Sequence, residues 1–298
     1  GDKKATITNA SYSTCTRIPG SKWLPDWVLE ASRIDTDSEE NVGEAYGAVV
    51  KLKQVPIFAL PYMSFPLNSD RKTGFLPPSV ASDNVSGLEI VTPYYVNLAP
   101  NYDVTLTPTL SSKRGVNLGT EFRYLNPTLS GTMNVDVMPS DKLRNNDKRW
   151  GVNANHQQYI PAGSTVGGLL LNVEFNRVSD NNYWRDFPRA SGALTQRLLP
   201  TNVDLDWRRG SWSSGLKFSK WQTLQDPGAV ISPPYDRLPH WYLNYDAVNV
   251  NSGFNLKANT EITKFKSDPA ITLQTNGTRA FNEIEVSRPF KSPAHFIT

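Results

Sequence analysis

The sequence predicts an all-β protein whose larger part is a portion of an antiparallel transmembrane β-barrel. Three observations support this class: long runs of period-two alternation, predicted strands of membrane-crossing length, and connections that are long at one end of the strands and short at the other. In Tyr102–Leu110 every even position is apolar or proline, whereas the odd positions are Asp103 and threonines. Val116–Leu125 alternates in the same way. Such alternation is typical of strands with one apolar and one wet face.

The first 66 residues are expected to contain three or four strands and no capped helix. Alternation places strands at Ala5–Asn9, Asp26–Ile34 and Val42–Pro56. This segment has too little apolar area to stand alone, so it must complete a larger sheet. Prolines interrupt regular pairing, and we therefore expect a hinge into the next domain at Pro56, Pro61 and Pro66.

From Gly74 onward about a dozen strands are predicted. After the two alternating runs they are Thr132–Met138, Trp150–Gln157, Gly168–Val178, Leu194–Arg208, Trp212–Thr223, Trp241–Asn249, Phe254–Phe265 and Phe281–Ser287. Their lengths fit the roughly 9–11 residues of a tilted membrane-crossing strand and exceed the usual soluble length of about 5–6.

The connections between these strands fall into two classes. Short links lie at Leu98–Asn101, Asn126–Ser130, Arg209–Ser211 and Val250–Ser252, and Gln158–Thr165 is intermediate. Long links rich in charge, Asn and Pro lie at Ser140–Arg149, Ser179–Ser191 and Gln225–Leu238, with Ser112–Arg114 a brief exception. Long loops on one side and tight turns on the other are typical of an outer-membrane barrel.

Composition and face polarity narrow the class further. The hydrophobic content is 38%, and no apolar run approaches the roughly 18 residues of a membrane helix. A net charge of +3, without a basic stripe interleaved with aromatics, excludes a nucleic-acid binder. The polar face of the strands must be wet, because burying its charges would cost several kcal/mol each. Those charges are Asp103, Glu121, Arg123, Asp136, Glu174, Asp204 and Asp206. The pattern favours a membrane barrel over a soluble β-sandwich.

No catalytic or metal-binding pattern emerges. The three histidines, His156, His240 and His295, lack metal-type spacing and have no serine or cysteine companion. Asp141 and Asp180 lie in predicted loops, where we expect solvated charges. The single Cys15 excludes an internal disulfide, and in an exported protein it can pair with a partner outside this segment. We therefore expect no enzyme activity, no metal and no cofactor.

Several phrases in order along the whole chain resemble the LptD family (also called Imp or OstA) of lipopolysaccharide-assembly proteins of the Gram-negative outer membrane. They are VPIFALPYMSFP at 55–66, RKTGFL at 71–76, TPYYVNLAPNYDVTLTP at 92–108, KRGVNLGTEFRYL at 113–125, VMPSD at 137–141, FNRVSDNNYWRDF at 175–187 and PPYDRLP at 233–239. The resemblance implies a periplasmic β-jellyroll followed by a very large barrel. We expect residues 1–66 to be the last strands of the jellyroll and residues 67–298 the first, incomplete part of the barrel.

The resemblance also implies a function and partners. Lipopolysaccharide would move along a jellyroll groove, through the barrel lumen and out of a lateral gate into the outer leaflet. The implied partners are an LptE-type lipoprotein plug, a periplasmic LptA-type bridge and outer-membrane lipid. A general porin or a soluble β-sandwich binding module is the alternative. A porin would need neither a jellyroll segment nor a proline-weakened strand pair, and a soluble module would stay monomeric without detergent.

Site residues follow from the same resemblance. Pro78 and Pro93 match the family's prolines beside the lateral gate, although most strand prolines simply mark a strand end or bulge. Cys15 matches the jellyroll cysteine that pairs with a C-terminal cysteine, which lies outside this chain. Candidate lipid-groove residues, equally compatible with ordinary core packing, are Trp27, Leu29, Val50 and Leu52. Four cations suit lipopolysaccharide phosphates, with surface solubility the more common role: Arg71, Lys72, Lys113 and Arg114.

Overall fold

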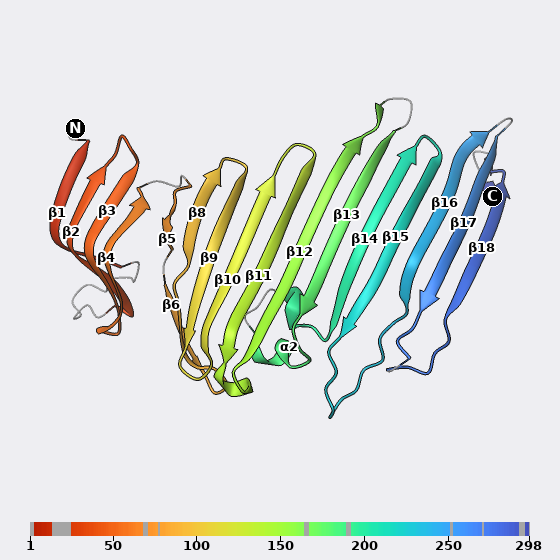
Figure 1. Ribbon diagram of the computed structural model, residues 1–298. Helices are drawn as coiled ribbons and strands as arrows, with labels where there is room; N and C mark the ends of the chain where they lie inside the picture. The colour runs from red at the N-terminus through yellow and green to blue at the C-terminus, as the bar shows by residue number, and fades with distance from the viewer. Residues whose placement is uncertain are drawn as a thin grey trace. The chain divides into compact units, whose positions relative to one another are not determined.

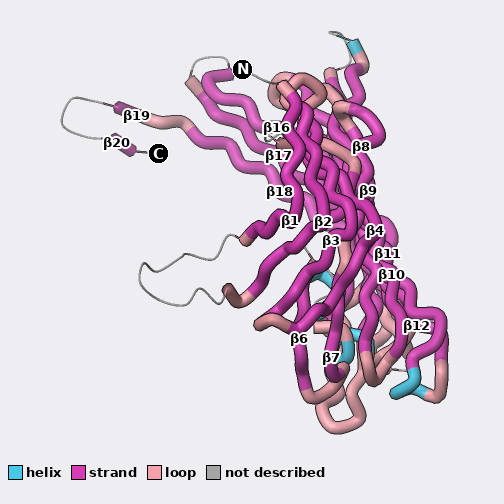
Figure 2. The backbone as a smooth tube through the Cα atoms, turned by 90° about the vertical axis from the view of Figure 1, so that its left-hand side faces the viewer, coloured by secondary structure: helices cyan, strands magenta, loops and turns pink. Residues whose placement is uncertain are grey.

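The computed structural model describes residues 3–13, 25–67, 71–76, 78–163, 167–188, 192–250, 253–269, 271–291 and 296–297. The fold is all-β with antiparallel sheets, and Figure 2 shows helix only in a few short segments. Among these residues no helix is both long and apolar enough to span a membrane. The chain divides into two compact units, one of residues 1–81 and 90–108 and the other of residues 82–89 and 109–298.

The first sheet has four strands in chain order. They are β1 (Lys4–Tyr12), β2 (Trp27–Asp37), β3 (Val42–Leu52) and β4 (Val55–Pro66). The prediction of a single strand at Val42–Pro56 was wrong, because the chain turns at Lys53 and Gln54. Both residues have a positive φ, 46° and 70°, which reverses the chain where the sequence has no glycine to mark a turn.

The prolines of β4 do not form the expected hinge. Pro56 pairs with Lys51 and Pro66 with Val42, so β4 stays in the ladder along its length, with one irregularity beside Lys51. The prediction failed because β4 is an edge strand, and a proline on an edge can turn its missing donor away from the ladder. The sheet carries a small buried cluster of Ala31, Ile34, Ala45 and Ala48.

The second sheet contains 14 strands. Its main order is β18-β17-β16-β15-β14-β13-β12-β11-β10-β9-β7-β6, with β8 pairing both β5 and β9. The strands are β5 (Gly74–Phe75), β6 (Ser79–Asp83), β7 (Gly87–Val91), β8 (Tyr94–Ala99), β9 (Tyr102–Ser111), β10 (Gly115–Leu125), β11 (Leu129–Asp141), β12 (Asp147–Pro161), β13 (Gly168–Val178), β14 (Leu198–Arg209), β15 (Trp212–Thr223), β16 (Asp236–Val250), β17 (Phe254–Lys266) and β18 (Gly277–Ser287). A separate short pair joins β19 (Phe290–Lys291) to β20 (Phe296–Ile297).

The predicted difference between the two ends of the strands is present from β10 to β18. Figure 1 shows the longer connections together at one end, including the one that carries α2 (Tyr183–Asp186), and the short turns at the other. The 3-10 helices η1 (Lys142–Arg144) and η2 (Gly192–Thr195) also lie in these longer connections.

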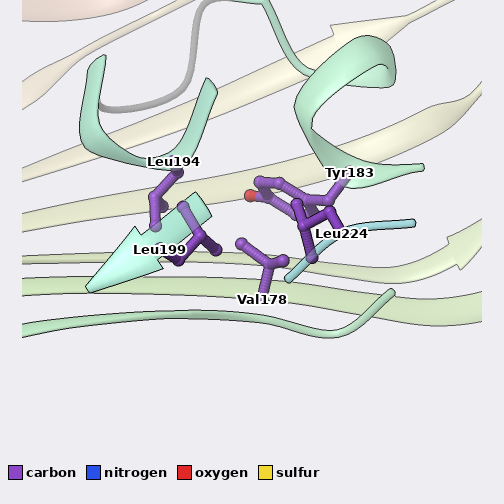
Figure 3. Close-up of a cluster of buried hydrophobic side chains, with 5 residues drawn as sticks. All are labelled: Val178, Tyr183, Leu194, Leu199 and Leu224. Atoms are coloured by element: carbon purple, nitrogen blue, oxygen red, sulfur yellow. The ribbon is translucent and has the colours of Figure 1, made fainter. Parts of the chain in front are cut away.

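The predicted strand at Leu194–Arg208 begins too early. The structure starts β14 at Leu198 and places Leu194 in η2. Leu194 and Leu199 are both fully buried, in a cluster completed by Val178, Tyr183 and Leu224 (Figure 3). An apolar residue next to a strand was therefore mistaken for part of it. Its burial comes from the folded connection and not from the sheet.

Candidate functional site in the first strands of the large sheet

Each candidate gate proline lies at a gap between two short strands. Pro78 follows the end of β5 and precedes β6, and Pro93 lies between β7 and β8. Both side chains are half-buried. We call Leu76 with Pro78, and Thr92 with Pro93, the proline breaks.

The breaks meet in one backbone pair. The Leu76 N–H donates to the Pro93 carbonyl at 2.9 Å, which extends the β5–β8 register of Phe75 opposite Tyr94. A hydrogen-bonded antiparallel pair normally exchanges two bonds. Proline has no N–H, so the return bond to the Leu76 carbonyl cannot form. One net backbone hydrogen bond, worth about 1 kcal/mol, is absent from this pair.

Arg71 lies just before β5 in the chain and binds it to the neighbouring strands. Its Nε donates to the Tyr95 hydroxyl at 2.7 Å, and its Nη1 donates to the Pro100 carbonyl at 3.0 Å. Its Nη2 forms an ion pair with Asp103, which also accepts from the Tyr95 hydroxyl at 3.1 Å. We call Arg71, Tyr95 and Asp103 the arginine clasp.

The clasp corrects the expectation that Asp103 is wet. The Asp103 residue is only 3% exposed, and the ion pair with Arg71 offsets its burial. Asn97 adds two hydrogen bonds in the same place. Its N–H donates to the Thr73 hydroxyl, and its side chain donates to the Arg71 carbonyl, each at 3.0 Å. The chain before β5 is thus firmly bound, whereas the ladder after β5 is weakened.

The candidate groove residues are cross-strand neighbours in the four-stranded sheet. Trp27 pairs with Leu52, and Leu29 pairs with Val50. Leu29 packs against the small alanine-rich core, and Val50 is half-buried. The side chains of Trp27 and Leu52 lie outside the described part of the structure, as does Cys15.

A second group of residues, at the ends of β9 to β13 that carry the longer connections, is a buried charge cluster. It comprises the buried Arg114, Asp141, Arg149 and Asp186 and the half-buried Asp180. Arg149 Nη1 donates to Asp141 at 2.9 Å and to Asp186 at 2.8 Å, while Arg114 Nη1 donates to Asp141 at 2.5 Å. Arg114 and Arg149 are each 2% exposed and Asp141 is 0% exposed. The expectations of a surface Arg114 and a solvated Asp141 were wrong, because the folded connections cover them.

Aromatic rings and hydrogen bonds complete the charge cluster. The Phe187 ring lies 4.7 Å from the Arg149 guanidinium carbon and 5.4 Å from that of Arg114. Burial acts to raise the pKa of Asp180, but hydrogen bonds from Arg149 and Ser179 outweigh it and hold this pKa below its ordinary value. Burial also raises the pKa of the Tyr183 phenol. Asp180 is thus a paired anion, and not the solvated charge that its loop position predicted.

The polar face of β13 to β17 contains a hollow of about 860 Å³. Its lining combines charged and aromatic side chains, including Asp206, Lys217, His240 and Tyr242. The Tyr242 hydroxyl donates to Asp206 at 2.6 Å, and His240 Nδ1 lies 2.7 Å from the Thr263 hydroxyl. Within the described residues no group of acidic, histidine or cysteine side chains could hold a metal ion. The hollow therefore offers polar contacts and ring faces.

Comparison with known proteins gives the family. The family model "LptD: LPS transport system D" matches residues 147–298, about half of the chain. The chain belongs to the LptD family. Proteins described as LPS-assembly protein LptD match it along essentially its whole length. The one from Albidiferax ferrireducens is 50% identical, that from a Polaromonas species 45%, and that from Ralstonia nicotianae 36%. The chain spans 38%, 37% and 34% of these LptD proteins, respectively.

Sequence reasoning about this LptD chain missed the arginine clasp and the charge cluster. Arg71 and Asp103 were noticed singly, but their 32-residue separation gives no local sign that they pair. The Arg149–Asp186 pair spans 37 residues and had no sign either. The one usable signal for these ion pairs was that charged residues recur at the ends of several predicted strands. In a soluble protein such residues would be taken for ordinary surface charges.

Proposed function

We propose that this chain is part of a lipopolysaccharide translocon of the outer membrane. Membership of the LptD family carries the proposal, and the interrupted pairing of the first two barrel strands supports its lateral exit. Residues 1–66 would be the last jellyroll strands, on the periplasmic side, and residues 67–298 the first barrel strands. Transport needs no catalysis by this chain, so we assign no catalytic residue and no cofactor.

The route has a lipid part and a saccharide part. The acyl chains would pass a groove in the four-stranded sheet lined by Trp27, Leu29, Val50 and Leu52. The saccharide would pass the polar barrel face, where the hollow beside Asp206 and Tyr242 provides hydrogen-bonding groups and aromatic rings. A sheet with one apolar and one polar face suits an amphipathic cargo that crosses a bilayer.

The exit would be a lateral gate at the proline breaks. In the LptD family the gate lies between the first and last strands, so the first strands must bend aside without unfolding the rest of the sheet. The pair of Leu76 and Pro93 has one backbone bond where two are usual, and β5 and β6 do not join across Pro78. The arginine clasp holds the chain just before the weakened pair, so bending there need not release the whole strand.

The partners follow from the same assignment. An LptE-type lipoprotein would plug the barrel, and a periplasmic LptA-type bridge would dock on the jellyroll and deliver lipopolysaccharide. Energy for transport would come from elsewhere in the pathway. Cys15 would form a disulfide with a cysteine outside this chain.

The gate is tested by Pro78→Ala combined with Pro93→Ala in the full-length protein. Each change restores a backbone donor, and we expect less lipopolysaccharide to reach the outer leaflet, as measured by labelling intact cells. Heat-modifiable gel migration reports whether the variant barrel has folded. Unchanged delivery by a folded variant would contradict the gate.

The disulfide is tested separately with Cys15→Ser in the full-length protein. Loss of the bond should change mobility on a non-reducing gel and leave mobility on a reducing gel unchanged. Equal mobility of the variant and the parent under both conditions would exclude the proposed bond.

A further inference from the structure

We count β5 with β6 as the first strand of the large sheet, β7 with β8 as the second and β9 as the third. The third strand contains Pro108, which lies opposite one of the proline breaks. The Pro108 carbonyl in β9 accepts a hydrogen bond from the Thr92 N–H at 3.1 Å. Thr92 opposite Pro108 continues the β8–β9 register, in which Tyr94 pairs with Leu106. Since proline has no N–H, the return bond to the Thr92 carbonyl is missing here as well.

Two consecutive residues therefore each belong to a pair with one backbone bond. Pro93 faces Leu76 of the first strand, and Thr92 faces Pro108 of the third. The ladder is weakened along a line that crosses two strand interfaces.

The position of Pro108 is unusual for a strand proline. β9 has neighbours on both sides and runs without interruption from Tyr102 to Ser111. Prolines within sheets are largely confined to edges, strand starts and bulges, because an interior proline removes a ladder bond. Among the other strand prolines of this sheet, Pro139 and Pro239 lie at register shifts and Pro161 ends β12, whereas Pro200 of β14 lies within a regular ladder, opposite Trp221.

We propose that Pro108 is a positioning residue of the lateral opening, an inference that rests on the proposed gate. Because Pro108 has no N–H to donate to the Thr92 carbonyl, the second strand is bound less tightly to the third. The first two strands can then bend as one pair. Pro108 acts through Thr92 and needs no contact with lipid.

The test uses Pro108→Ala in the full-length protein with its partners. The change supplies the missing N–H, and we expect lipopolysaccharide delivery to fall about fivefold, the factor that corresponds to one net hydrogen bond. Heat-modifiable migration should stay unchanged. Pro200→Ala is the matched control and should leave delivery at the parent level. If Pro108→Ala does not fold, Pro108→Val, whose branched side chain favours strands, replaces it.

A rescue variant shows whether the effect of Pro108→Ala comes from the added hydrogen bond or from altered side-chain packing. Adding Thr92→Pro to Pro108→Ala removes the opposite donor and returns the pair to a single bond. Thr92 lies in the break between β7 and β8, so the substitution places no proline inside a strand. Recovered delivery supports the proposal, whereas continued loss in a folded double variant overturns it. A drop with Pro93→Ala but none with Pro108→Ala also overturns it and leaves the gate intact. No drop with either variant instead rejects the gate itself.

Discussion

The buried charge cluster and the proline breaks differ in whether their polar groups have hydrogen-bond partners. In the charge cluster, Arg149 donates to three different carboxylates, and its own burial is nearly complete. At the proline breaks, a backbone carbonyl loses the donor that an ordinary strand would supply. The first region fixes several connections in one arrangement, because another arrangement would break ion pairs between buried charges. The second leaves strands in register but weakly joined.

This contrast suits the proposed function. A translocon with a lateral exit needs a barrel wall that holds its shape while its first pair of strands bends aside. Buried ion pairs are poor sources of net stability but strongly penalise their own disruption. A missing ladder bond lowers the cost of separation at one position only. The charge cluster thus makes its strands rigid, and the proline breaks make theirs easier to bend.

The largest expected effect comes from breaking the charge cluster. Arg149→Ala would leave Asp180 without its arginine partner and would remove one arginine each from the buried Asp141 and Asp186, at a cost near the lower end of about 3–5 kcal/mol. We expect the full-length barrel to lose its folded, fast-migrating form at a lower temperature. Arg279→Ala is the control, since Arg279 is 62% exposed and its contact with Glu261 is 3.5 Å long. Equal melting of both variants would show that the cluster adds no rigidity.

The next largest effect concerns the hydrophobic cluster beside the charge cluster. Leu199→Ala removes a fully buried side chain that packs with Tyr183 and Leu194 (Figure 3), so we expect a loss of about 2–5 kcal/mol. Hydrogen exchange of residues 179–197 should become faster. Leu273→Ala changes a fully exposed leucine and should alter neither quantity. Unchanged exchange in Leu199→Ala would mean that this connection folds independently of the cluster.

At the proline breaks, in contrast, we expect a substitution to increase stability. Pro93→Ala adds an N–H opposite the Leu76 carbonyl, so we expect this pair to be more stable by about 1 kcal/mol. Amide exchange at Leu76 should slow about fivefold in the full-length protein. Faster exchange would show that the proline's fixed φ matters more than its missing donor.

The smallest effect is a pH dependence at Asp180. Its pKa is lower in the folded protein than in the unfolded chain, so its contribution is fully present above the unfolded value of about 3.9. The contribution is lost as the pH falls through the lower, folded value. The protection factors of residues 179–188, which are corrected for the intrinsic pH dependence of amide exchange, should therefore be steady from pH 7 to about 5 and fall in stronger acid. Asp180→Asn should remove this acid-dependent step, and a step that persists in this variant would assign it to another carboxylate.

The sequence by itself determined the fold class and most strands. Alternation has a period of two, which a strand alone imposes on its side chains, so β9, β10, β13 and β15 were located closely. The two classes of connection were readable for the same local reason. The family resemblance was also readable, because it depends on the order of residues and not on their contacts. Boundaries failed at β3 and β14, where a turn without glycine and a buried loop residue gave misleading local signals.

Only the tertiary structure decided which polar residues are paired and which are weakly bonded. Asp103, Asp141 and Arg114 looked solvated, yet each is buried against partners far along the chain. Pro108 looked like one more residue of an alternating run until the register placed it opposite Thr92. Pairing depends on strand register and on the folding of the connections. Both are set by interactions between distant segments, and no local pattern encodes them.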